Sequence, residues 1–535
     1  MSDDTTMWEW LPQNRDWENW HKTIEGPVDG VYMHRYPPEN PAFGIDPINR
    51  CTRQIQRSIA HTRAAGRPVR GIGRGWSLSD ITLPQGRLID ISLLIGRKPI
   101  AAPQIDPGYQ GESAERGKLW LVQGGTYISE LNRTLEDNRF GRSLRTTGAA
   151  NGQTVIGASS TGTHGSALGF GAFHDQIVAI HLIANETTQY WLERASYPVL
   201  KDSFAQSLGA RPIRDDKLFN AVVMGLGAFG IIHNVVVETR SRRLFEAINN
   251  AHLTDPFDIP AGQQPVLNRF FYDADMRNLI ETLDFDAHPQ LKPPPGRGDP
   301  YFFQPILDPN TAPVEVLVTQ MYEKPWLAGY TPNYAANEST FGPGYDFISV
   351  LGFLLDRFPG MTPTFANIAR SQLFRYAPKT GSWGEQFGYK AARTKVASGS
   401  VAVPLDRALD TLDALIDLNT DIGGAPLVYG CRYVAKSDAL LAFNKWDTTF
   451  VVSLDGVENS RSRDFFARVP QAMEARGIPF TQHWGKTNHY TPQRVRTAYG
   501  ANVDAWLAAR EELLPASADR ALFTNDYLRV RGLAD

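Results

Sequence analysis

The chain has 535 residues, 42% hydrophobic and 21% charged, an ordinary globular composition with length for about two to four domains. Glycine and proline make up about 15% of it, below the roughly 25–30% typical of low-complexity disorder. Its 54 basic and 57 acidic residues give a net charge of −3, which argues against nucleic acid as a partner. Two cysteines, Cys51 and Cys431, are too few for a disulfide framework or a four-thiolate zinc site and favour a reducing compartment.

The sequence predicts neither a membrane span nor a signal peptide. The longest apolar stretch, Phe347–Leu355, is interrupted by Ser349 and Gly352 and falls short of the roughly 20 residues that cross a bilayer. The N-terminus is acidic and aromatic, whereas a signal peptide is basic and then apolar. We therefore expect a cytoplasmic protein.

Helix and strand signals alternate along the first 240 residues. A helix is expected from Asp46 to Gly66, with Asp46 as N-cap, Pro47 in the first turn and Gly66 as its stop. Another is expected over Thr126–Asn138, because Ile128, Leu131 and Leu135 share one face. The strands expected in this region are Pro68–Ile72, Leu88–Leu94, Trp120–Val122, Ile177–Ala184 and Gly230–Arg240.

Residues 146–171 contain so many Gly, Ser and Thr residues that we expect a long loop without helix or strand. Between Pro289 and Pro313, eight of 25 residues are proline, which predicts a surface excursion or lid without regular structure. A second irregular tract, Pro325–Tyr345, precedes the apolar segment Asp346–Tyr376. That segment is either plain core or the lining of a roomy apolar pocket.

The C-terminal part predicts an amphipathic helix over Pro404–Leu418 and a strand over Pro426–Val434. A second helix is expected over Asp464–Arg476, where Pro470 either kinks the helix or marks its start. Strand alternation places Tyr429, Cys431 and Tyr433 on one face, and Gly430 and Arg432 on the other.

Two glycine motifs raise the question of a nucleotide. Gly225, Gly227 and Gly230 spell G-x-G-x-x-G, but a β-branched strand follows where a dinucleotide fingerprint needs a helix. The hypothesis that the protein is a nicotinamide dehydrogenase depends on this motif alone. The turn with Gly71, Gly73 and Gly75 can instead direct backbone N–H groups at an anion such as a pyrophosphate. Its alternative interpretation is a plain glycine turn.

Six motifs occur in the order found in one family. They are DWENW (16–20), GIGRGWSLSDI (71–81), VIGASSTGTHG (155–165), LFNAVVMGLGAFGII (218–232), HWGK (483–486) and LFTNDYL (522–528). The chain thus resembles the FAD-linked oxidases of the vanillyl-alcohol oxidase superfamily, in the sugar-lactone and alditol oxidase branch. The resemblance is dense over residues 1–240 and returns at roughly 420–535.

The resemblance implies an α+β fold, with a two-subdomain PCMH-type FAD-binding domain and a substrate domain built on an antiparallel sheet flanked by helices. We expect the FAD-binding domain over residues 1–240, with a C-terminal return of about 515–535, and the substrate or cap domain over 241–514. The residues that match the family's cofactor contacts are Gly73, Arg74, Gly75, Trp76, Ser77, Gly148, Thr154, Gly157, Thr161, Gly162, Thr163, His164 and Ile232.

Three positions depart from the family pattern. Trp76 stands where many members carry the histidine that bonds to the flavin, so we expect FAD to be non-covalent. Gly430, Cys431 and Arg432 stand where the branch has Glu-x-Arg, so the carboxylate is absent while the cation remains. Ser453 aligns with a histidine of alditol oxidases. These differences predict that polyols and sugar lactones are poor substrates, and they leave the general base unassigned.

Lys486 and Arg432 are the expected catalytic residues, since fixed cations stabilise the negative charge that develops when a hydride is transferred to flavin. The alternative for Lys486 is a solvated surface lysine. His483 and His489 lack a third ligand nearby in sequence and are interpreted as structural, so no metal site is predicted.

We therefore expect an FAD-dependent oxidoreductase that takes a hydride from an alcohol, an amine or an activated C–H group of a bulky, fairly apolar small molecule. A sugar-lactone or alditol oxidase and a catalytically lapsed FAD-binding protein are the alternatives. In the superfamily that the chain resembles, a residue in the loop before the second cofactor motif controls the access of O₂ to the flavin, so small residues at Gly148, Ala149 and Ala150 favour an oxidase over an enzyme that uses another acceptor. The alternative is a tight turn that needs glycine and alanine. The sequence does not indicate an oligomeric state.

Overall fold

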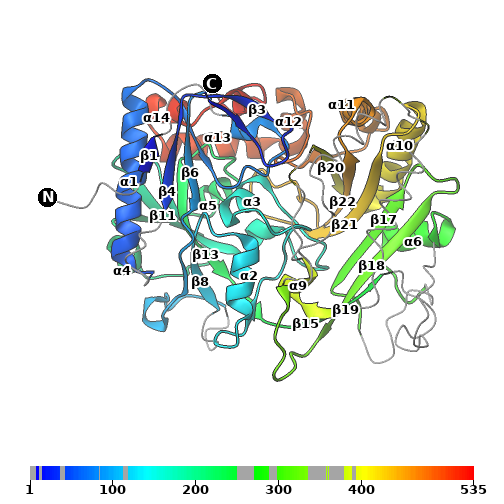
Figure 1. Cartoon of the computed structure of the whole chain (residues 1–535), viewed down its shortest axis with the longest axis horizontal. Helices are drawn as coiled ribbons and strands as arrows, with labels where there is room; N and C mark the ends of the chain where they lie inside the picture. The colour runs from blue at the N-terminus through cyan, green and yellow to red at the C-terminus, as the bar shows by residue number, and fades with distance from the viewer. Residues whose placement is uncertain are drawn as a thin grey trace.

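The computed structural model describes most of the chain, namely residues 8–10, 15–35, 43–83, 85–111, 118–249, 270–287, 298–334, 357, 360, 379–387, 393 and 395–534. Figure 1 shows two lobes side by side: the first holds the N-terminal elements and the last helices, and the second holds one large sheet. The expected α+β class is confirmed. No helix in the described ranges is both long and apolar enough to cross a membrane.

The first lobe contains two main sheets. The smaller has the order β1-β4-β6-β5, with β4, β5 and β6 parallel; its strands are β1 (Trp8–Trp10), β4 (Gly30–Arg35), β5 (Val69–Ile72) and β6 (Arg87–Leu93). The larger has the order β12-β11-β10-β13-β8-β7; its strands are β7 (Arg97–Pro99), β8 (Leu119–Gln123), β10 (Ile177–Ile183), β11 (Gln189–Glu193), β12 (Arg211–Arg214) and β13 (Ile231–Glu238).

Helix α1 (Ile45–Ala64) connects β4 to β5 and buries Cys51, Ile55 and Ile59 on one stripe. The helix is confirmed, but the predicted N-cap is wrong. Gly44 occupies the N-cap position and Asp46 lies in the first turn, where a carboxylate interacts favourably with the helix dipole. The other helices of this lobe are α2 (Ile128–Glu136), α3 (Val155–Thr161), α4 (Asp202–Ser207) and α5 (Asp216–Val222).

The prediction of a loop without helix over residues 146–171 is wrong at α3. Thr154 caps this helix by accepting a hydrogen bond from the Gly157 amide at 3.3 Å, and Gly162 ends it with a φ of 88°. Threonine at the N-cap and glycine at the C-cap are helix-boundary signals. The abundance of small residues concealed them.

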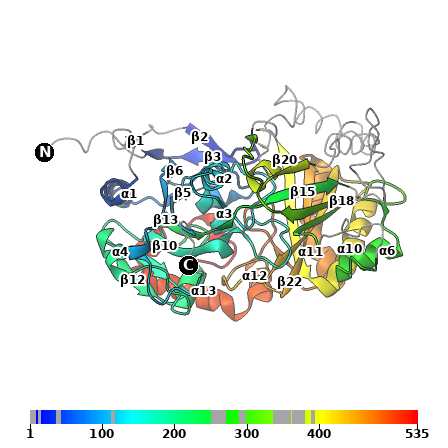
Figure 2. The same cartoon turned by 90° about the horizontal axis from the view of Figure 1, so that it is seen from below.

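The second lobe is a nine-stranded sheet with the order β19-β15-β18-β17-β21-β22-β20-β23, and β16 pairs with β18. Its strands are β15 (Leu244–Asn249), β16 (Phe270–Phe271), β17 (Phe302–Asp308), β18 (Glu315–Lys324), β19 (Lys379–Ser382), β20 (Val396–Pro404), β21 (Leu427–Ala435), β22 (Thr448–Val457) and β23 (Thr481–Gln482). Helices α6 (Ala274–Thr282), α10 (Ala408–Asp421) and α11 (Ser460–Ala475) cover one face (Figure 2).

Two predictions about this lobe need correction. Strand β17 lies inside the proline-rich tract that we expected to be irregular; Pro305 keeps its place opposite Val318, because pairing to β21 involves only Ile306 and Leu307. Pro470 lies inside α11, which begins at Ser460, so Pro470 does not mark a helix start. The expected apolar segment Asp346–Tyr376 lies outside the described residues, except positions 357 and 360.

The C-terminal segment packs against the first lobe (Figure 1). Its helices are α12 (Pro492–Tyr499), α13 (Ala501–Leu513), α14 (Ser517–Leu522) and α15 (Asp526–Arg529). The rings of Trp506 and Phe229 meet edge to face with centroids 4.9 Å apart, a contact that stabilises beyond its buried area. The chain therefore returns to the first lobe after completing the large sheet.

Glu136, at the end of α2, links the first lobe to residues 334 and 382–384 of the second lobe. Its fully buried carboxylate accepts hydrogen bonds from Ser382 Oγ at 2.6 Å, Tyr334 Oη at 2.7 Å and the Gly384 amide at 2.7 Å. Burial raises the pKa of Glu136 to about 7 in spite of these donors. The short helix α9 (Trp383–Gln386) is positioned by this contact.

Candidate functional site

The glycine turn at 73–77 follows β5, and neighbouring side chains leave no room for additional atoms on its glycines. A Cβ on Gly73 would lie 2.1 Å from Thr154 Oγ1, and one on Gly75, which has a φ of 62°, would lie 2.8 Å from the Trp17 ring. The turn is clasped by the hairpin of β2 (Arg15–Glu18) and β3 (Glu25–Val28), in which Asn19 Nδ2 donates to the Ser77 carbonyl at 2.8 Å. The two glycines therefore allow the turn to pack closely against Thr154 and Trp17.

The second predicted cofactor segment meets this turn directly. Thr154 contacts the Gly73 position, Thr161 Oγ1 donates to the Gly157 carbonyl at 2.8 Å, and a Cβ on Gly148 would lie 2.8 Å from Thr163 Cγ2. The structure thus brings together glycine turn 73–77 and segment 148–164. Ile232, on β13, lies beside α3, because a Cβ on Gly124 would contact both the Ile232 carbonyl and Ile156.

Trp76 and Arg74 belong to an aromatic cluster at this turn. The Trp76 ring stacks on Trp20 with centroids 5.7 Å apart and an interplanar angle of 15°. The Arg74 guanidinium lies 5.4 Å from the Trp20 ring centroid and 5.2 Å from that of Tyr127, within the range of cation–π attraction. The Trp76 side chain therefore packs within this cluster, and it offers no nucleophilic nitrogen.

Buried polar atoms in segment 146–153 indicate that a polar ligand belongs there. Within the described residues no partner is recorded for Thr146 Oγ1, Thr147 Oγ1, either polar atom of the Asn151 amide or Gln153 Oε1. A buried polar group without a partner costs about 1–3 kcal/mol, so these atoms, close to the glycine turn, suit a long ligand with many polar atoms. FAD fits this requirement.

The literal G-x-G-x-x-G of Gly225–Gly230 serves a different purpose. It leads directly into β13, and a Cβ on Gly227 would lie 2.8 Å from the guanidinium of buried Arg70. Arg70 donates to the Gly227 carbonyl at 3.0 Å. The motif allows a turn to pack tightly, as the absence of a following helix predicted.

The large sheet turns a polar face away from its covering helices. Gly430 and Arg432 lie on this face of β21, while Tyr429, Cys431 and Tyr433 are in the core beneath the helices, as predicted. The register places Ser453 opposite both Gly430 and Ser400, and Asp455 opposite Ser398. We call the group made by Ser398, Ser400, Arg432, Ser453 and Asp455 the polar sheet face.

Lys486 completes this group from the loop after β23. Its Nζ lies 3.1 Å from Asp455 Oδ1 and 3.5 Å from Ser453 Oγ. Its side chain is 21% exposed, so it is an interior ion-pair partner and not a solvated surface lysine. Ser398 Oγ also donates to Asp455 Oδ1, and Ser400 and Ser453 share a hydrogen bond at 3.3 Å.

Arg432 links the polar sheet face to the cofactor segments. Its Nη1 donates to the His164 carbonyl at 3.1 Å. The His164 and His483 rings lie 5.9 Å apart, and burial with the neighbouring cations Arg432 and Lys486 lowers both pKa values, that of His483 to about 3. Both imidazoles are therefore neutral at physiological pH, and the charge of the site resides on Arg432, Lys486 and Asp455.

The charges of Lys486 and Asp455 depend on each other. Burial lowers the pKa of Lys486, and the Asp455 carboxylate opposes that shift. Burial alone would raise the pKa of Asp455, but Lys486, Ser398 and Arg432 together hold it below its ordinary value. Asp455 is consequently ionised near neutral pH.

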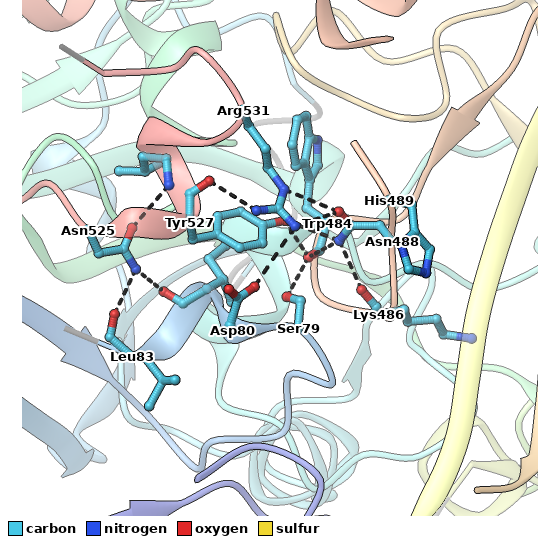
Figure 3. A network of polar contacts seen from close by, with 12 residues as sticks. Ser79, Asp80, Leu83, Trp484, Lys486, Asn488, His489, Asn525, Tyr527 and Arg531 are labelled. Atoms are coloured by element: carbon cyan, nitrogen blue, oxygen red, sulfur yellow. Dashed lines mark hydrogen bonds and ion pairs between the residues drawn. The ribbon is translucent and has the colours of Figure 1, made fainter. Parts of the chain in front are cut away.

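A polar network holds the Lys486 loop against the first lobe (Figure 3). Asn488 Nδ2 donates to the Lys486 carbonyl at 2.9 Å, and Arg531 Nη2 donates to Asn488 Oδ1 at 3.1 Å. Ser79 Oγ and Tyr527 Oη both donate to the Trp484 carbonyl, at 2.8 and 3.0 Å. The loop that carries Lys486 is thus fixed to the end of the glycine turn and to the C-terminal segment.

The sequence reasoning missed Asp455 and Gln304. Asp455 lies two residues after Ser453 and therefore on the same strand face, which was the available signal. Gln304, on β17, could be found only from the fold: a Cβ on Gly430 would lie 3.3 Å from Gln304 Nε2. An amide from a neighbouring strand thus lies beside the position of the absent glutamate.

Comparison with known proteins agrees with this architecture. No protein-family model matches the chain. It is 23% identical over 482 residues to the L-gulono-1,4-lactone dehydrogenase of Mycobacterium tuberculosis, a match that covers 88% of this chain and 92% of the relative. It is also 26% identical over 189 residues to the D-arabinono-1,4-lactone oxidase of Debaryomyces hansenii, covering 35% of this chain and 30% of that one.

Solved structures show the same fold. A solvent-stable cholesterol oxidase superimposes with a TM-score of 0.67 at 15% identity, over 98% of both chains. The cholesterol oxidase of B. sterolicum gives a TM-score of 0.67 at 14% identity, over 98% of this chain and 97% of that chain. With its ordered motifs, its relatives and its fold, the chain is similar to FAD-dependent oxidoreductases of the vanillyl-alcohol oxidase superfamily.

Proposed function

We propose that this FAD-dependent oxidoreductase oxidises a carbon that bears a hydroxyl group, in a small molecule whose remainder is bulky and fairly apolar. The observation that carries the proposal is the gathering of Arg432, Lys486 and Asp455 on the polar sheet face, joined to the cofactor segments through the His164 carbonyl. A protein that only bound FAD would have no use for buried Arg432, largely enclosed Lys486 and a carboxylate at one place.

The residues divide the work between holding FAD and supporting the reaction. We propose that Gly73, Arg74, Gly75, Trp76, Ser77, Gly148, Thr154, Gly157, Thr161, Gly162, Thr163, His164 and Ile232 hold FAD, in a domain of residues 1–240 completed by the C-terminal return. FAD, when bound, supplies the acceptor for a hydride. Arg432 and Lys486 stabilise the negative charge that accumulates beside them as the hydride leaves the substrate.

The hydrogen bonds of the polar sheet face favour one reacting hydroxyl over many. Ser398 donates to Asp455, and Ser400 and Ser453 bond to each other, so two of the three serine protons are already in use. Each hydroxyl left unmatched in such a site costs roughly 1–3 kcal/mol. The cholesterol oxidases that share the fold are named for a substrate of the bulky kind, whereas the lactone relatives support the sugar-lactone alternative.

An anaerobic screen decides between these substrates. Cholesterol in detergent, xylitol and L-gulono-1,4-lactone are mixed with the oxidised holoenzyme, and the loss of absorbance near 450 nm, a general property of reduced flavins, is followed. We expect cholesterol to reduce the flavin fastest. Faster reduction by xylitol or the lactone would establish the alternative. If none of the three compounds reduces the flavin, the proposed function is wrong.

We propose that FAD is held without a covalent bond and that O₂ is the acceptor. Acid precipitation should release all flavin into the supernatant, because the Trp76 indole offers no nucleophilic nitrogen. Gly148 is small because it packs on Thr163, so oxygen access is better tested at half-buried Ala149. Ala149→Val should slow reoxidation of the reduced enzyme by aerated buffer, while wild type reoxidises within seconds and forms peroxide.

A further inference from the structure

The two oxygens of the Asp455 carboxylate have different surroundings. Oδ1 accepts hydrogen bonds from both Ser398 Oγ and Lys486 Nζ. No hydrogen bond to Oδ2 is recorded from any residue that the structure describes, and the side chain is 45% exposed although it lies on the inner polar face of the sheet. One oxygen is thus held in place, and the other is available to a ligand.

We infer that Asp455 is the catalytic proton acceptor of this enzyme, and that its Oδ2 takes the proton of the substrate hydroxyl. The inference rests on the proposed oxidation of an alcohol. It assigns the role that the absent glutamate at Gly430 leaves open.

The step balances without a further reactant. The substrate O–H bond breaks and its proton passes to Oδ2, while the electron pair of the neighbouring C–H bond leaves with the hydride, and the carbon and oxygen become a carbonyl. As the hydride departs, the hydroxyl acquires the acidity of a protonated carbonyl. A carboxylate that is a weak base at rest is therefore sufficient to receive the proton.

The groups around Asp455 keep it ready for this step. Lys486 from the loop after β23 and Arg432 from β21 are cations, and they hold the pKa of Asp455 below its ordinary value; Ser398 from β20 donates to the same carboxylate. His164 and His483 on the first-lobe side are neutral because burial lowers their pKa values. The two histidines therefore add no charge beside Asp455.

The test replaces Asp455 by Asn, which keeps the shape but cannot take a proton. The substrate is whichever of cholesterol, xylitol and L-gulono-1,4-lactone reduces the wild type fastest. Asp455→Asn should retain its FAD and slow anaerobic reduction by about 10²–10⁴-fold, the usual range for a lost general base. The fall in kcat/KM that the wild type shows on the acidic side should disappear, and Asp455→Glu should recover part of the rate. Asp410→Asn, an exposed carboxylate paired with Arg407 on the outer helix, is the control and should be unchanged.

A binding measurement distinguishes a role of Asp455 in proton transfer from a purely structural role. The oxidised product presents a carbonyl oxygen to Oδ2, which a carboxylate repels and an Asn amide can meet with a donor. Asp455→Asn should therefore bind the product about tenfold more tightly, the equivalent of one hydrogen bond, as measured by perturbation of the flavin spectrum. Reduction of Asp455→Asn at the wild-type rate, or product affinity that is unchanged or weaker, overturns the assignment while leaving the proposed function intact. If no alcohol reduces the wild type, both fail together.

Discussion

The two sides of the site are built in different ways. The proposed cofactor side consists of closely packed turns, as at Gly73 and Gly148, where a single added carbon would collide with a threonine. The proposed substrate side consists of side chains on three strands and one loop, arranged by charge. The comparison teaches that shape governs the first side and charge the second. Changes of size and changes of charge should therefore have separable effects.

The largest effect should come from removing charge on the substrate side. Lys486→Ala should slow anaerobic flavin reduction by about 10²–10³-fold, the usual cost of losing one charge-assisted contact to a transition state. FAD content should be unchanged, because Lys486 supports no part of the glycine turn with its side chain. Stopped-flow reduction and the ratio of flavin to protein absorbance measure the two quantities.

Lys217, an exposed lysine of α5, provides the control for Lys486. Lys217→Ala should behave as wild type. Loss of FAD from Lys486→Ala, with a normal reduction rate in the molecules that keep it, would break the division between the two sides.

The next effect should come from adding size on the cofactor side. In Gly73→Ala the new methyl would meet Thr154 Oγ1 at 2.1 Å. Overpacking of this kind costs about 1–3 kcal/mol, so FAD affinity should fall by about one to two powers of ten. Titration of the apoprotein with FAD measures the change.

Gly298→Ala is the matched substitution, since a Cβ there would meet no atom within 4 Å. Holoenzyme prepared from Gly73→Ala at saturating FAD should still be reduced at a near-normal rate. A reduction rate that falls as far as in Lys486→Ala would show that shape and charge are not separable here.

A smaller effect should follow from loosening the loop that joins the two sides. Asn488→Ala removes the donor to the Lys486 carbonyl and the acceptor of Arg531, and should slow reduction about tenfold, the equivalent of about 1.4 kcal/mol in positioning. If Asn488 acts by positioning Lys486, the double variant Asn488→Ala/Lys486→Ala should be no slower than Lys486→Ala alone. Asn138→Ala, an exposed position beside Arg242, is the control. Fully additive losses would assign Asn488 a separate role.

The smallest effect concerns the lock between the lobes. Burial raises the pKa of Glu136 to about 7 from an ordinary value of 4.5, so between these values the folded protein binds more protons than the unfolded chain. The contribution of Glu136 to stability is therefore full below pH 4.5 and is lost as pH rises through 7. The melting temperature of the wild type should fall between pH 5 and pH 8. In Glu136→Gln this fall should be smaller by about 2 °C. Equal slopes for variant and wild type would contradict the sign of this shift.

The cofactor side was largely predictable from the sequence, and the substrate side was not. Glycines at 73, 75 and 162 are demanded by close approach or positive φ, and such requirements leave local, ordered motifs. Helix α3 was not predicted, because the many small residues around it made the N-cap signal of Thr154 and the C-cap signal of Gly162 hard to recognise. Even there, the residues predicted to contact FAD lie together with the glycine turn, since Thr154 contacts the Gly73 position.

On the substrate side, the function of a residue depends on its neighbours across the sheet. Asp455 faces Ser398, which is 57 positions earlier, and is paired with Lys486, which is 31 positions later. Gln304 lies beside Gly430 only because β17 and β21 are neighbours in the sheet. No local pattern encodes these contacts, since they are set by the register between strands. Arg432 was identified only because it belongs to a motif within a single strand.

The network around Asn488 also constrains the order in which the protein can assemble. Asn525 donates to the carbonyl of Ile81 across 444 positions of sequence, and Arg531 anchors the Lys486 loop from the same segment. During synthesis, N-terminal domains ordinarily fold first, at the pace of translation. Here the first lobe must wait for residues 522–533 to leave the ribosome before its glycine turn and the Lys486 loop can lock together. The first lobe is thus expected to reach its final packing only late in synthesis, and the proposed FAD site to be completed at that stage.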